Sequence, residues 1–287
     1  MAFPPAKVNL GLFVAGKRPD GFHDLASFFV PLSGARGWTD VLELDVLSGR
    51  FERGVRLQMD GIAIPGASRE NLVLRAYHLL DAHFGHTLPD VDFRLNKKIP
   101  TGAGLGGGSA DGTFALRMLN SALSLGLEDN DLLTFAEQLG SDCPFFIQDD
   151  PAWVTGRGEC IEPAPELFDA LRGHHIAVVH PGIHVSTAEA FAGITPRADV
   201  PEIRDCIEKP VEEWAACGLV NDFQPGITAQ HPEIAEALAA VSEGALFASM
   251  TGTGSAVYGI FKTAADAERV ARSGADRGWS AHAGPLG

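Results

Sequence analysis

The chain has 287 residues, of which 45% are hydrophobic and 21% charged, and its formal net charge at pH 7 is −15. This composition is ordinary for a globular protein, and the length suggests about two domains. The acidic balance argues against a nucleic-acid partner, because phosphate backbones require clustered Lys and Arg. No segment approaches the roughly 18 apolar residues that span a bilayer. The first residues, Met1 to Lys7, contain neither a basic leader nor an apolar run, which favours the cytoplasm.

The cysteines and histidines give no sign of a metal site. Four cysteines occur without any Cys-x-x-Cys pair, at Cys143, Cys160, Cys206 and Cys217. We therefore expect a reduced protein with no disulfide and no structural zinc. No histidine metal site is expected either, so we predict no metal-ligating residues.

Apolar periodicity predicts an alternation of strands and helices along the chain. Alternating apolar residues indicate several strands between residues 6 and 62, with a turn at Gly16 to Gly21. Asn71 is a suitable N-cap for a helix that reaches Phe84. The further expected elements are a strand at 91–96, a helix from Ser109 or Asp111 to Leu125, a helix at 129–139, a strand at 176–179, a helix at 232–241, a strand at 255–261, a helix at 264–273 and a last strand at 279–283.

The most informative segment is a glycine loop, Ile-Pro-Thr-Gly-Ala-Gly-Leu-Gly-Gly-Gly-Ser at residues 99–109. Glycines allow positive φ and let the backbone approach a ligand closely. A helix that begins after such a loop presents its N–H groups and positive dipole end to an anion, commonly a phosphate. A dinucleotide fold requires an acidic residue about twenty positions after such a loop, and Walker A requires a Lys after the last glycine. This sequence has neither residue at those positions. The loop therefore predicts another kind of phosphate site, with Ser109 offering a hydroxyl to phosphate or Mg²⁺.

Four further residues allow two interpretations each. Lys7 and Asn9 share one face of a predicted strand. Either the two side chains form a polar pair directed into a cavity, or Lys7 is a solvated lysine at the edge of a sheet. Asp142 follows a helix end, where it is a turn residue or a general base. His23, after a glycine turn and an aromatic residue, is a loop residue or part of a base-stacking pocket. A second glycine turn at 251–255 is unspecific by itself.

Taken together and in this order, these segments resemble the GHMP kinases, the superfamily of galactokinase, homoserine kinase and mevalonate kinase. The resemblance covers nearly the whole chain, and the glycine loop marks the superfamily. Asp-Gly-Phe-His at 20–23 and Ser-Asp-Cys-Pro-Phe-Phe at 141–146 point to a member that phosphorylates a cytidine-diphosphate-linked methylerythritol.

The resemblance implies an α+β fold of two domains. Residues 1–163 would form an ATP-binding domain like ribosomal protein S5 domain 2, and residues 164–287 a ferredoxin-like domain, with the active site between them. It also implies transfer of phosphate from ATP, with Mg²⁺, to the 2-hydroxyl of the cytidyl substrate in the non-mevalonate isoprenoid pathway. The oligomeric state stays open between monomer and homodimer.

The resemblance assigns roles residue by residue. Asp142 matches the base position and Lys7 the catalytic lysine, which would keep that carboxylate ionised. The ATP site would contain Asn71, Lys97, Gly102, Ala103, Gly104, Leu105, Gly106, Gly107, Gly108 and Ser109. The substrate site would contain Asn9, Phe22, His23, Thr187 and Phe191. Phe22 stands where the family often has tyrosine, and a stacking role survives that change because the aromatic face is kept.

Two other functions compete with this interpretation. Another GHMP small-molecule kinase, of the mevalonate or homoserine type, would share the glycine loop but gives no reason for Phe22 and His23. A non-catalytic nucleotide-binding protein on the same fold would tolerate loss of Lys7 and Asp142, yet both are present.

Overall fold

The computed structural model describes residues 1–18, 21–33, 37–47, 54–64, 70–167, 171–197, 200 and 202–286. The chain forms two compact units that are not consecutive in sequence. The first unit comprises residues 1–6, 39–99 and 106–149, and the second comprises residues 7–38, 100–105 and 150–287. The expected boundary at residue 163 concerns the two family domains, which these units do not delimit, and it stays a prediction.

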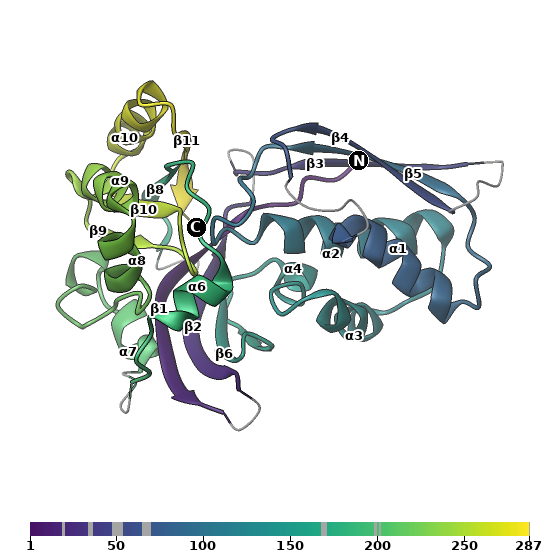
Figure 1. Ribbon diagram of the computed structural model, residues 1–287, viewed down its shortest axis with the longest axis horizontal. Coiled ribbons are helices and arrows are strands. Elements are labelled where there is room, and N and C mark those ends of the chain that lie inside the picture. Colours follow the sequence, from purple (N-terminus) through teal and green to yellow (C-terminus); the bar gives the residue numbers. More distant parts are fainter. Residues whose placement is uncertain are drawn as a thin grey trace. The chain divides into compact units, whose positions relative to one another are not determined.

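The first unit is a three-stranded sheet with helices on one face (Figure 1). Its strand order is β3-β5-β4, with β3 antiparallel and β4 parallel to the central β5. The helices α1 to α4 pack beneath it. The elements are β3 (Val41–Val46), β4 (Val55–Gly61), α1 (Leu72–His83), β5 (Val91–Lys97), α2 (Gly107–Leu123), α3 (Asp129–Leu139) and α4 (Phe145–Gln148).

Local sequence explains the ends and faces of these elements. The Asn71 side chain caps α1 by accepting the Val73 N–H at 2.9 Å. Residues 73, 76, 77 and 80 of α1 are buried, as the helical period requires for one apolar face. Helix α3 begins with a reciprocal capping box between Glu128 and Asp131. The apolar faces of α1, α2 and α3 share one core with the sheet.

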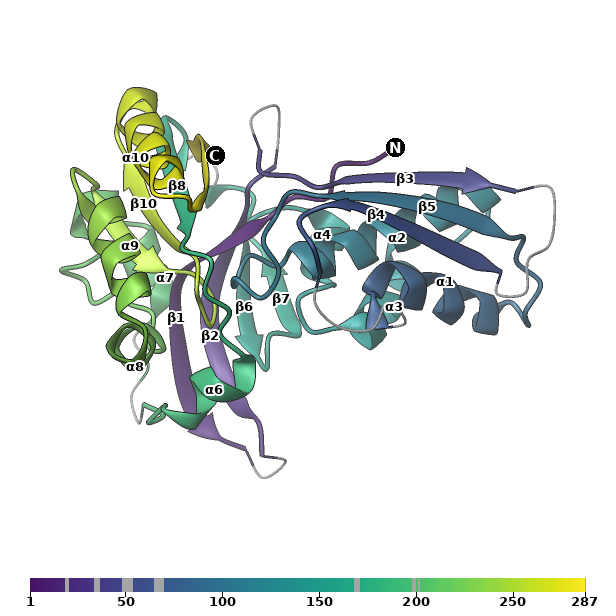
Figure 2. The ribbon, with the colours of Figure 1, turned by 45° about the horizontal axis from the view of Figure 1, so that its top comes forward.

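The second unit contains two four-stranded antiparallel sheets, in the orders β1-β2-β6-β7 and β11-β8-β10-β9. The strands of the first of these sheets lie side by side in Figure 2. Its strands are β1 (Lys7–Lys17), β2 (His23–Pro31), β6 (Ala152–Gly156) and β7 (Cys160–Pro163). The second sheet consists of β8 (His174–His180), β9 (Phe247–Met250), β10 (Val257–Phe261) and β11 (Ser280–Leu286).

Helices α9 and α10 of the second unit pack on the second sheet, and one core joins them to β1. Leu12 and Val14 of β1 are buried in the same cluster as side chains of β8 and β10. The helical elements are α6 (Thr187–Ala192), α7 (Ile203–Ile207), η2 (Val211–Glu213), α8 (Gln224–Gln230), α9 (Pro232–Ser242) and α10 (Ala264–Asp276). The expected α+β class is confirmed.

The structure corrects two expectations. Helix α2 begins at Gly107 rather than at Ser109 or Asp111, because Gly106 in the left-handed region closes the loop before it. The expectation of four free thiols is wrong, since Cys206 and Cys217 form a disulfide, while Cys143 and Cys160 are free. A separation of 11 positions in sequence does not keep these two cysteines apart, because the turn after α7 brings them together. Residues 19–20 of the expected turn at Gly16 to Gly21 lie outside the described residues.

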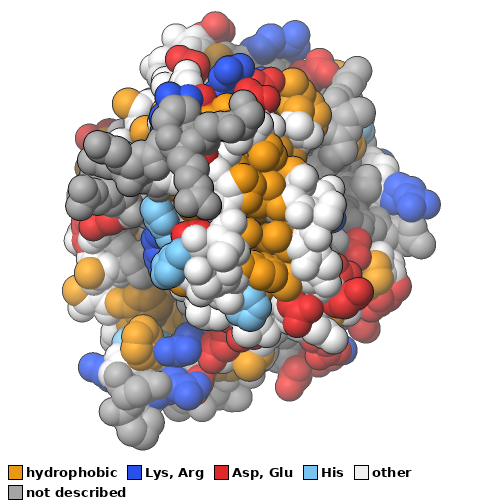
Figure 3. Space-filling model, turned by 90° about the vertical axis from the view of Figure 1, so that its right-hand side faces the viewer, with side chains coloured by type: hydrophobic (Ala, Val, Ile, Leu, Met, Phe, Trp, Pro, Cys, Tyr) orange, Lys and Arg blue, Asp and Glu red, His pale blue; other side chains and the backbone are white. Residues whose placement is uncertain are grey.

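No helix in the described part of the chain is both long and apolar enough to cross a membrane. Figure 3 views the side that carries the labels of β4, β5 and α1 in Figure 1. A band of hydrophobic side chains runs down the middle of this face, with Asp and Glu side chains beside its lower end. Exposed acidic groups of this kind account for part of the net charge of −15.

Candidate functional site

The glycine loop belongs to both units, since residues 100–105 fall in the second and residues from 106 onward in the first. In the first unit, Gly106 is the N-cap of α2 with φ 69°, a value that favours glycine. Its lack of a side chain leaves the start of α2 without a side-chain cap among the described residues. The first N–H groups of a helix need a partner, and an anion satisfies them.

Ser109 ties this helix start to the segment that contains Asp142. Hydrogen bonds join the Cys143 thiol to the hydroxyls of Ser109 and Thr113, and Thr113 Oγ1 donates to the Cys143 carbonyl at 2.9 Å. Burial raises the pKa of Cys143 to about 11, so the thiol stays neutral and unreactive. Asp142 lies half-buried in the turn after α3, next to this thiol. The first unit thus places Ser109 and the Asp142 segment together.

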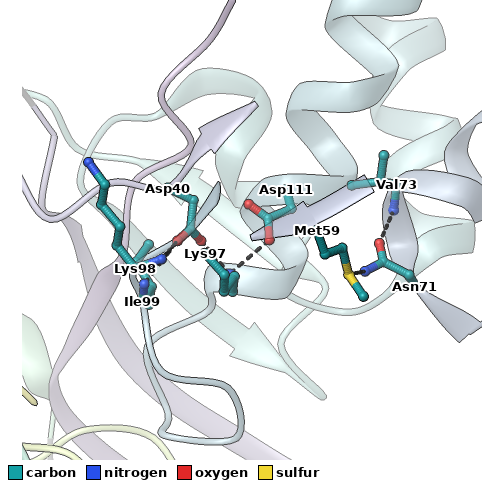
Figure 4. Close-up of polar contacts among 8 residues, drawn as sticks. All are labelled: Asp40, Met59, Asn71, Val73, Lys97, Lys98, Ile99 and Asp111. Atoms are coloured by element: carbon teal, nitrogen blue, oxygen red, sulfur yellow. Dashed lines mark hydrogen bonds and ion pairs between the residues drawn. The ribbon is translucent and has the colours of Figure 1, made fainter. Parts of the chain in front are cut away.

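Lys97 lies in the same unit, but its ammonium group is occupied. Its Nζ makes an ion pair with Asp40 and a second one with Asp111 at 2.8 Å (Figure 4). The Lys97 and Asp40 side chains are 0% exposed. A contact between Lys97 and ATP, which stays a prediction, would therefore use its main chain.

Asn71, the other predicted nucleotide residue of this unit, has its two amide atoms directed apart. Its oxygen caps α1, while its Nδ2 lies 3.7 Å from the sulfur of Met59 on β4 (Figure 4). Met59 is 43% exposed, so an apolar surface lies beside an amide donor. A planar base can use both.

The second unit holds its part of the loop by main-chain contacts. Lys7 N donates to Leu105 O at 2.9 Å, and Ala256 N donates to Ala103 O at 3.1 Å. Gly104 has φ +76°, and a Cβ there would overlap the carbonyl of Thr251. The Thr251 hydroxyl donates to Gly104 O at 3.2 Å. These contacts fix the loop backbone before any ligand arrives.

The predicted pair Lys7 and Asn9 forms a buried polar network on β1. Lys7 Nζ donates to Asn9 Oδ1 at 2.6 Å, and Asn9 Nδ2 donates to Ser27 Oγ at 2.9 Å. Lys7 is 3% exposed, so the solvated-edge interpretation is wrong. The Thr251 hydroxyl is 3.0 Å from Asn9 N and 3.1 Å from Asn9 Oδ1. The network therefore connects the lysine to the turn that holds the glycine loop.

The predicted base pocket is partly assembled in the second unit. The rings of His23 and Phe191 stack with centroids 5.1 Å apart and 19° between their planes. Phe22 is exposed, and the Arg157 guanidinium lies 5.0 Å from its ring centroid. Thr187 is exposed at the first position of α6, after the N-cap Ser186.

Comparison with known proteins identifies the family of this chain. The model of the GHMP kinases N terminal domain matches residues 71–150, and that of the GHMP kinases C terminal matches residues 200–278. The 4-diphosphocytidyl-2-C-methyl-D-erythritol kinase of Bacteroides thetaiotaomicron is 42% identical over 263 residues, covering 91% of this chain and 92% of that protein. The chain belongs to the 4-diphosphocytidyl-2-C-methyl-D-erythritol kinase family.

Solved structures agree with this family. A crystal structure of 4-(cytidine 5'-diphospho)-2C-methyl-D-erythritol kinase matches with a TM-score of 0.80 and 30% identity, over 100% of this chain and 98% of that one. Homoserine kinase from Cytophaga hutchinsonii matches with a TM-score of 0.67 at 15% identity, over 99% of this chain and 94% of that one, which shows a shared fold. The chain is thus a small-molecule kinase of the GHMP type that uses ATP.

Sequence reasoning missed several polar residues of this kinase. Thr251 stands in a glycine turn that is unspecific in the sequence, yet it contacts both Asn9 and the loop. The Tyr258 hydroxyl donates to Asn9 O at 2.9 Å, and a tyrosine in an apolar strand gives no sign of this role. Asp40 and Asp111 lie 57 and 14 positions from their partner Lys97, beyond any local pattern.

Proposed function

We propose that this kinase transfers the γ-phosphoryl group of ATP to the 2-hydroxyl of 4-diphosphocytidyl-2-C-methyl-D-erythritol, a step of the non-mevalonate isoprenoid pathway. One observation carries the proposal. The glycine loop ends in an uncapped helix start whose Ser109 is joined through Cys143 to the segment of Asp142. Phosphate-binding N–H groups and a carboxylate for the acceptor hydroxyl are what phosphoryl transfer requires.

In this proposal Asp142 receives the proton of the acceptor hydroxyl, and Lys7 supplies positive charge. The loop N–H groups of residues 102–109 hold the phosphates, and Mg²⁺ neutralises them. Among the described residues no group of three or more His, Cys, Asp or Glu side chains is arranged to hold a metal ion. We therefore assign Mg²⁺ to the phosphates of ATP, with the Ser109 hydroxyl as a protein contact.

We further propose that the second unit recognises the cytidine. Its stacked His23 and Phe191 offer aromatic faces and a ring nitrogen for the base. Phe22 supplies another exposed face, and Asn9 and Thr187 supply polar groups. Neither mevalonate nor homoserine contains a base that could stack, so these aromatic residues favour the cytidyl substrate over either alternative.

Replacement of Asp142 by Asn tests the proposal. The amide cannot accept the hydroxyl proton, so kcat should fall by about 10² to 10⁴-fold, while the Kd for ADP should change less than about three-fold. The measurement is ADP release with ATP and Mg²⁺, beside calorimetric titration of ADP. Asp45→Asn, at an exposed aspartate paired with Arg94, is the control and should keep full activity.

The same assay should offer the cytidyl substrate, mevalonate and homoserine separately. Turnover of the cytidyl compound alone is the expected result. Turnover of mevalonate or homoserine instead would contradict the proposed substrate but keep the kinase assignment. An Asp142→Asn variant with near-normal kcat would contradict the proposed base.

A further inference from the structure

Three charged side chains meet in the interior of the first unit. One of them, Lys97, shortly precedes the glycine loop in sequence, and another, Asp111, shortly follows it. Lys97 ends β5, Asp40 directly precedes β3, and Asp111 lies in α2. The Asp111 side chain is 3% exposed, and Lys97 and Asp40 are fully buried. Figure 4 shows the Lys97 ammonium between the two carboxylates. Burying three charges is costly, so the arrangement calls for a reason beyond packing.

Asp40 holds the main chain that leads into the loop. Its Oδ1 accepts the N–H of Lys98 at 2.5 Å and that of Ile99 at 2.9 Å, while Oδ2 pairs with Lys97. Ile99 is the first residue of the glycine loop. A charged acceptor makes stronger hydrogen bonds than a neutral one, so the direction in which the chain enters the loop is fixed by this carboxylate.

Lys97 holds the other end of the same segment, the first turn of α2. Its Nζ donates to Asp111 Oδ2 at 2.8 Å, and it lies 3.0 Å from where a Cβ on Gly107 would stand. Ile99 Cγ2 lies 2.8 Å from the same point. The ammonium and the Ile99 side chain therefore pack directly against the residue that opens α2, whose N–H groups are proposed to bind phosphate.

The charges of the three groups do not cancel when all are ionised. One ammonium and two carboxylates leave a net charge of −1 beneath a site for an anion. Burial raises the pKa of Asp111 to about 7, opposed by Lys97 and reinforced by Asp40. Burial alone would lower the pKa of Lys97, but Asp111 and Asp40 outweigh it and raise that pKa. In the described residues Asp111 Oδ1 has no hydrogen-bond partner, an atom that can carry a proton.

We propose that Asp40, Lys97 and Asp111 are positioning residues for ATP, which fix residues 98–99 and the first turn of α2 so that the loop N–H groups face the phosphates. This inference rests on the proposed phosphate role of the loop. None of the three side chains contacts the substrate in this account, and Lys97 acts from below the loop rather than as a nucleotide ligand.

Two variants of Asp40 test the inference. Asp40→Leu removes the acceptor for both main-chain N–H groups, whereas Asp40→Asn keeps one side-chain oxygen to accept them. Asp40→Leu should raise the KM for ATP by about ten- to a hundred-fold, with the KM for the cytidyl substrate changed less than about three-fold. Asp40→Asn should recover most of the loss. Amide hydrogen exchange in the protein without nucleotide should accelerate in Asp40→Leu at residues 98–99 and 107–109.

Asp92→Asn is the control, because Asp92 is another buried aspartate of the first unit, on β5, paired with Arg56 and Gln58. It should change neither KM nor exchange at 107–109. The inference would be overturned if Asp40→Leu raised the KM for ATP and the KM for the cytidyl substrate by the same factor. An unchanged KM for ATP in a folded Asp40→Leu variant would also overturn it. If Gly108→Ala weakens ATP binding while Asp40→Leu does not, the network inference fails alone. If neither variant does so, the proposed phosphate role of the loop fails.

Discussion

A substitution at Gly108 can test the proposed phosphate binding without disturbing the structure of the loop. A methyl group added there meets no protein atom within 4 Å, and its φ lies outside the left-handed region. Ala is preferred to Gly inside a helix by up to about 1 kcal/mol, so Gly108→Ala should not lower the melting temperature. The methyl group would occupy the space proposed for a phosphate, so the KM for ATP should rise about ten-fold or more.

The control for this variant is Gly226→Ala in α8, where an added methyl group also meets no atom within 4 Å. Melting curves and the KM for ATP should be measured for both variants. Gly226→Ala should leave the KM unchanged. An unchanged KM in Gly108→Ala would contradict the position proposed for the phosphates.

Single residues also show where sequence reasoning succeeds. Strand alternation alone places Lys7 and Asn9 on one face, and their side chains do meet at 2.6 Å. Burial of Lys7 could not be predicted, because it depends on strands and turns far away in the chain. The charge of Lys97 gave no hint of its ion pairs, since Asp40 lies 57 positions away. Local pattern predicts direction, whereas partners come from the tertiary fold.

At the scale of elements, Asn71 combines a capping role with a proposed contact to ATP, and the two can be separated. Its oxygen caps α1, and its amide nitrogen faces Met59. Asn71→Asp keeps the capping oxygen and adds a negative charge that suits a helix N-terminus, so stability should be unchanged or higher. The variant loses the amide donor, so the KM for ATP should rise about three- to ten-fold if Asn71 contacts the base, as predicted.

Asn71→Ala loses both functions and should cost about 1 kcal/mol of stability as well. Urea unfolding and the KM for ATP, measured on both variants, separate the cap from the nucleotide contact. A normal KM in a fully stable Asn71→Asp would show that the amide makes no contact with ATP and serves α1 alone.

Elements with strong periodicity were predictable, and short or buried ones were not. The cap of α1, the alternation of β3 and the amphipathic period of α3 are all local signals, and those elements exist. The strands β6 and β7 have only five and four residues, which is too short for a period to be recognised. The place of β6 beside β2 is set by pairing between residues more than 100 positions apart, and β7 pairs with β6.

At the scale of the whole molecule, the two compact units do not follow the order of the sequence. β1 and β2 are N-terminal, yet Leu12 and Val14 lie in one core with β8 and β10. Residues 100–105 are likewise grouped with the second unit, between two segments of the first. A chain that returns to an earlier sheet leaves no compositional trace, because a buried strand has the same apolar residues whichever sheet it joins.

The buried charged cluster of Asp40, Lys97 and Asp111 also predicts how the stability of the whole molecule depends on pH. The pKa of Asp111 is raised from 3.8 to about 7, first by burial. The folded protein therefore holds a proton that the unfolded chain releases above about pH 4, and the stability from this proton is lost as pH rises toward 7. Asp111→Asn is neutral at every pH and avoids this loss, which amounts to at most a few kcal/mol.

The melting temperature of Asp111→Asn relative to the unaltered protein should therefore increase by several °C between pH 5 and pH 8. Differential scanning calorimetry at both values measures the change, with Asp45→Asn as an exposed control whose offset should stay constant. The comparison of two variants cancels the contributions of the other carboxylates, which titrate in all three proteins. An equal offset of Asp111→Asn at both pH values would mean that Asp111 holds no proton in the folded protein, and that the network keeps its net negative charge beneath the loop.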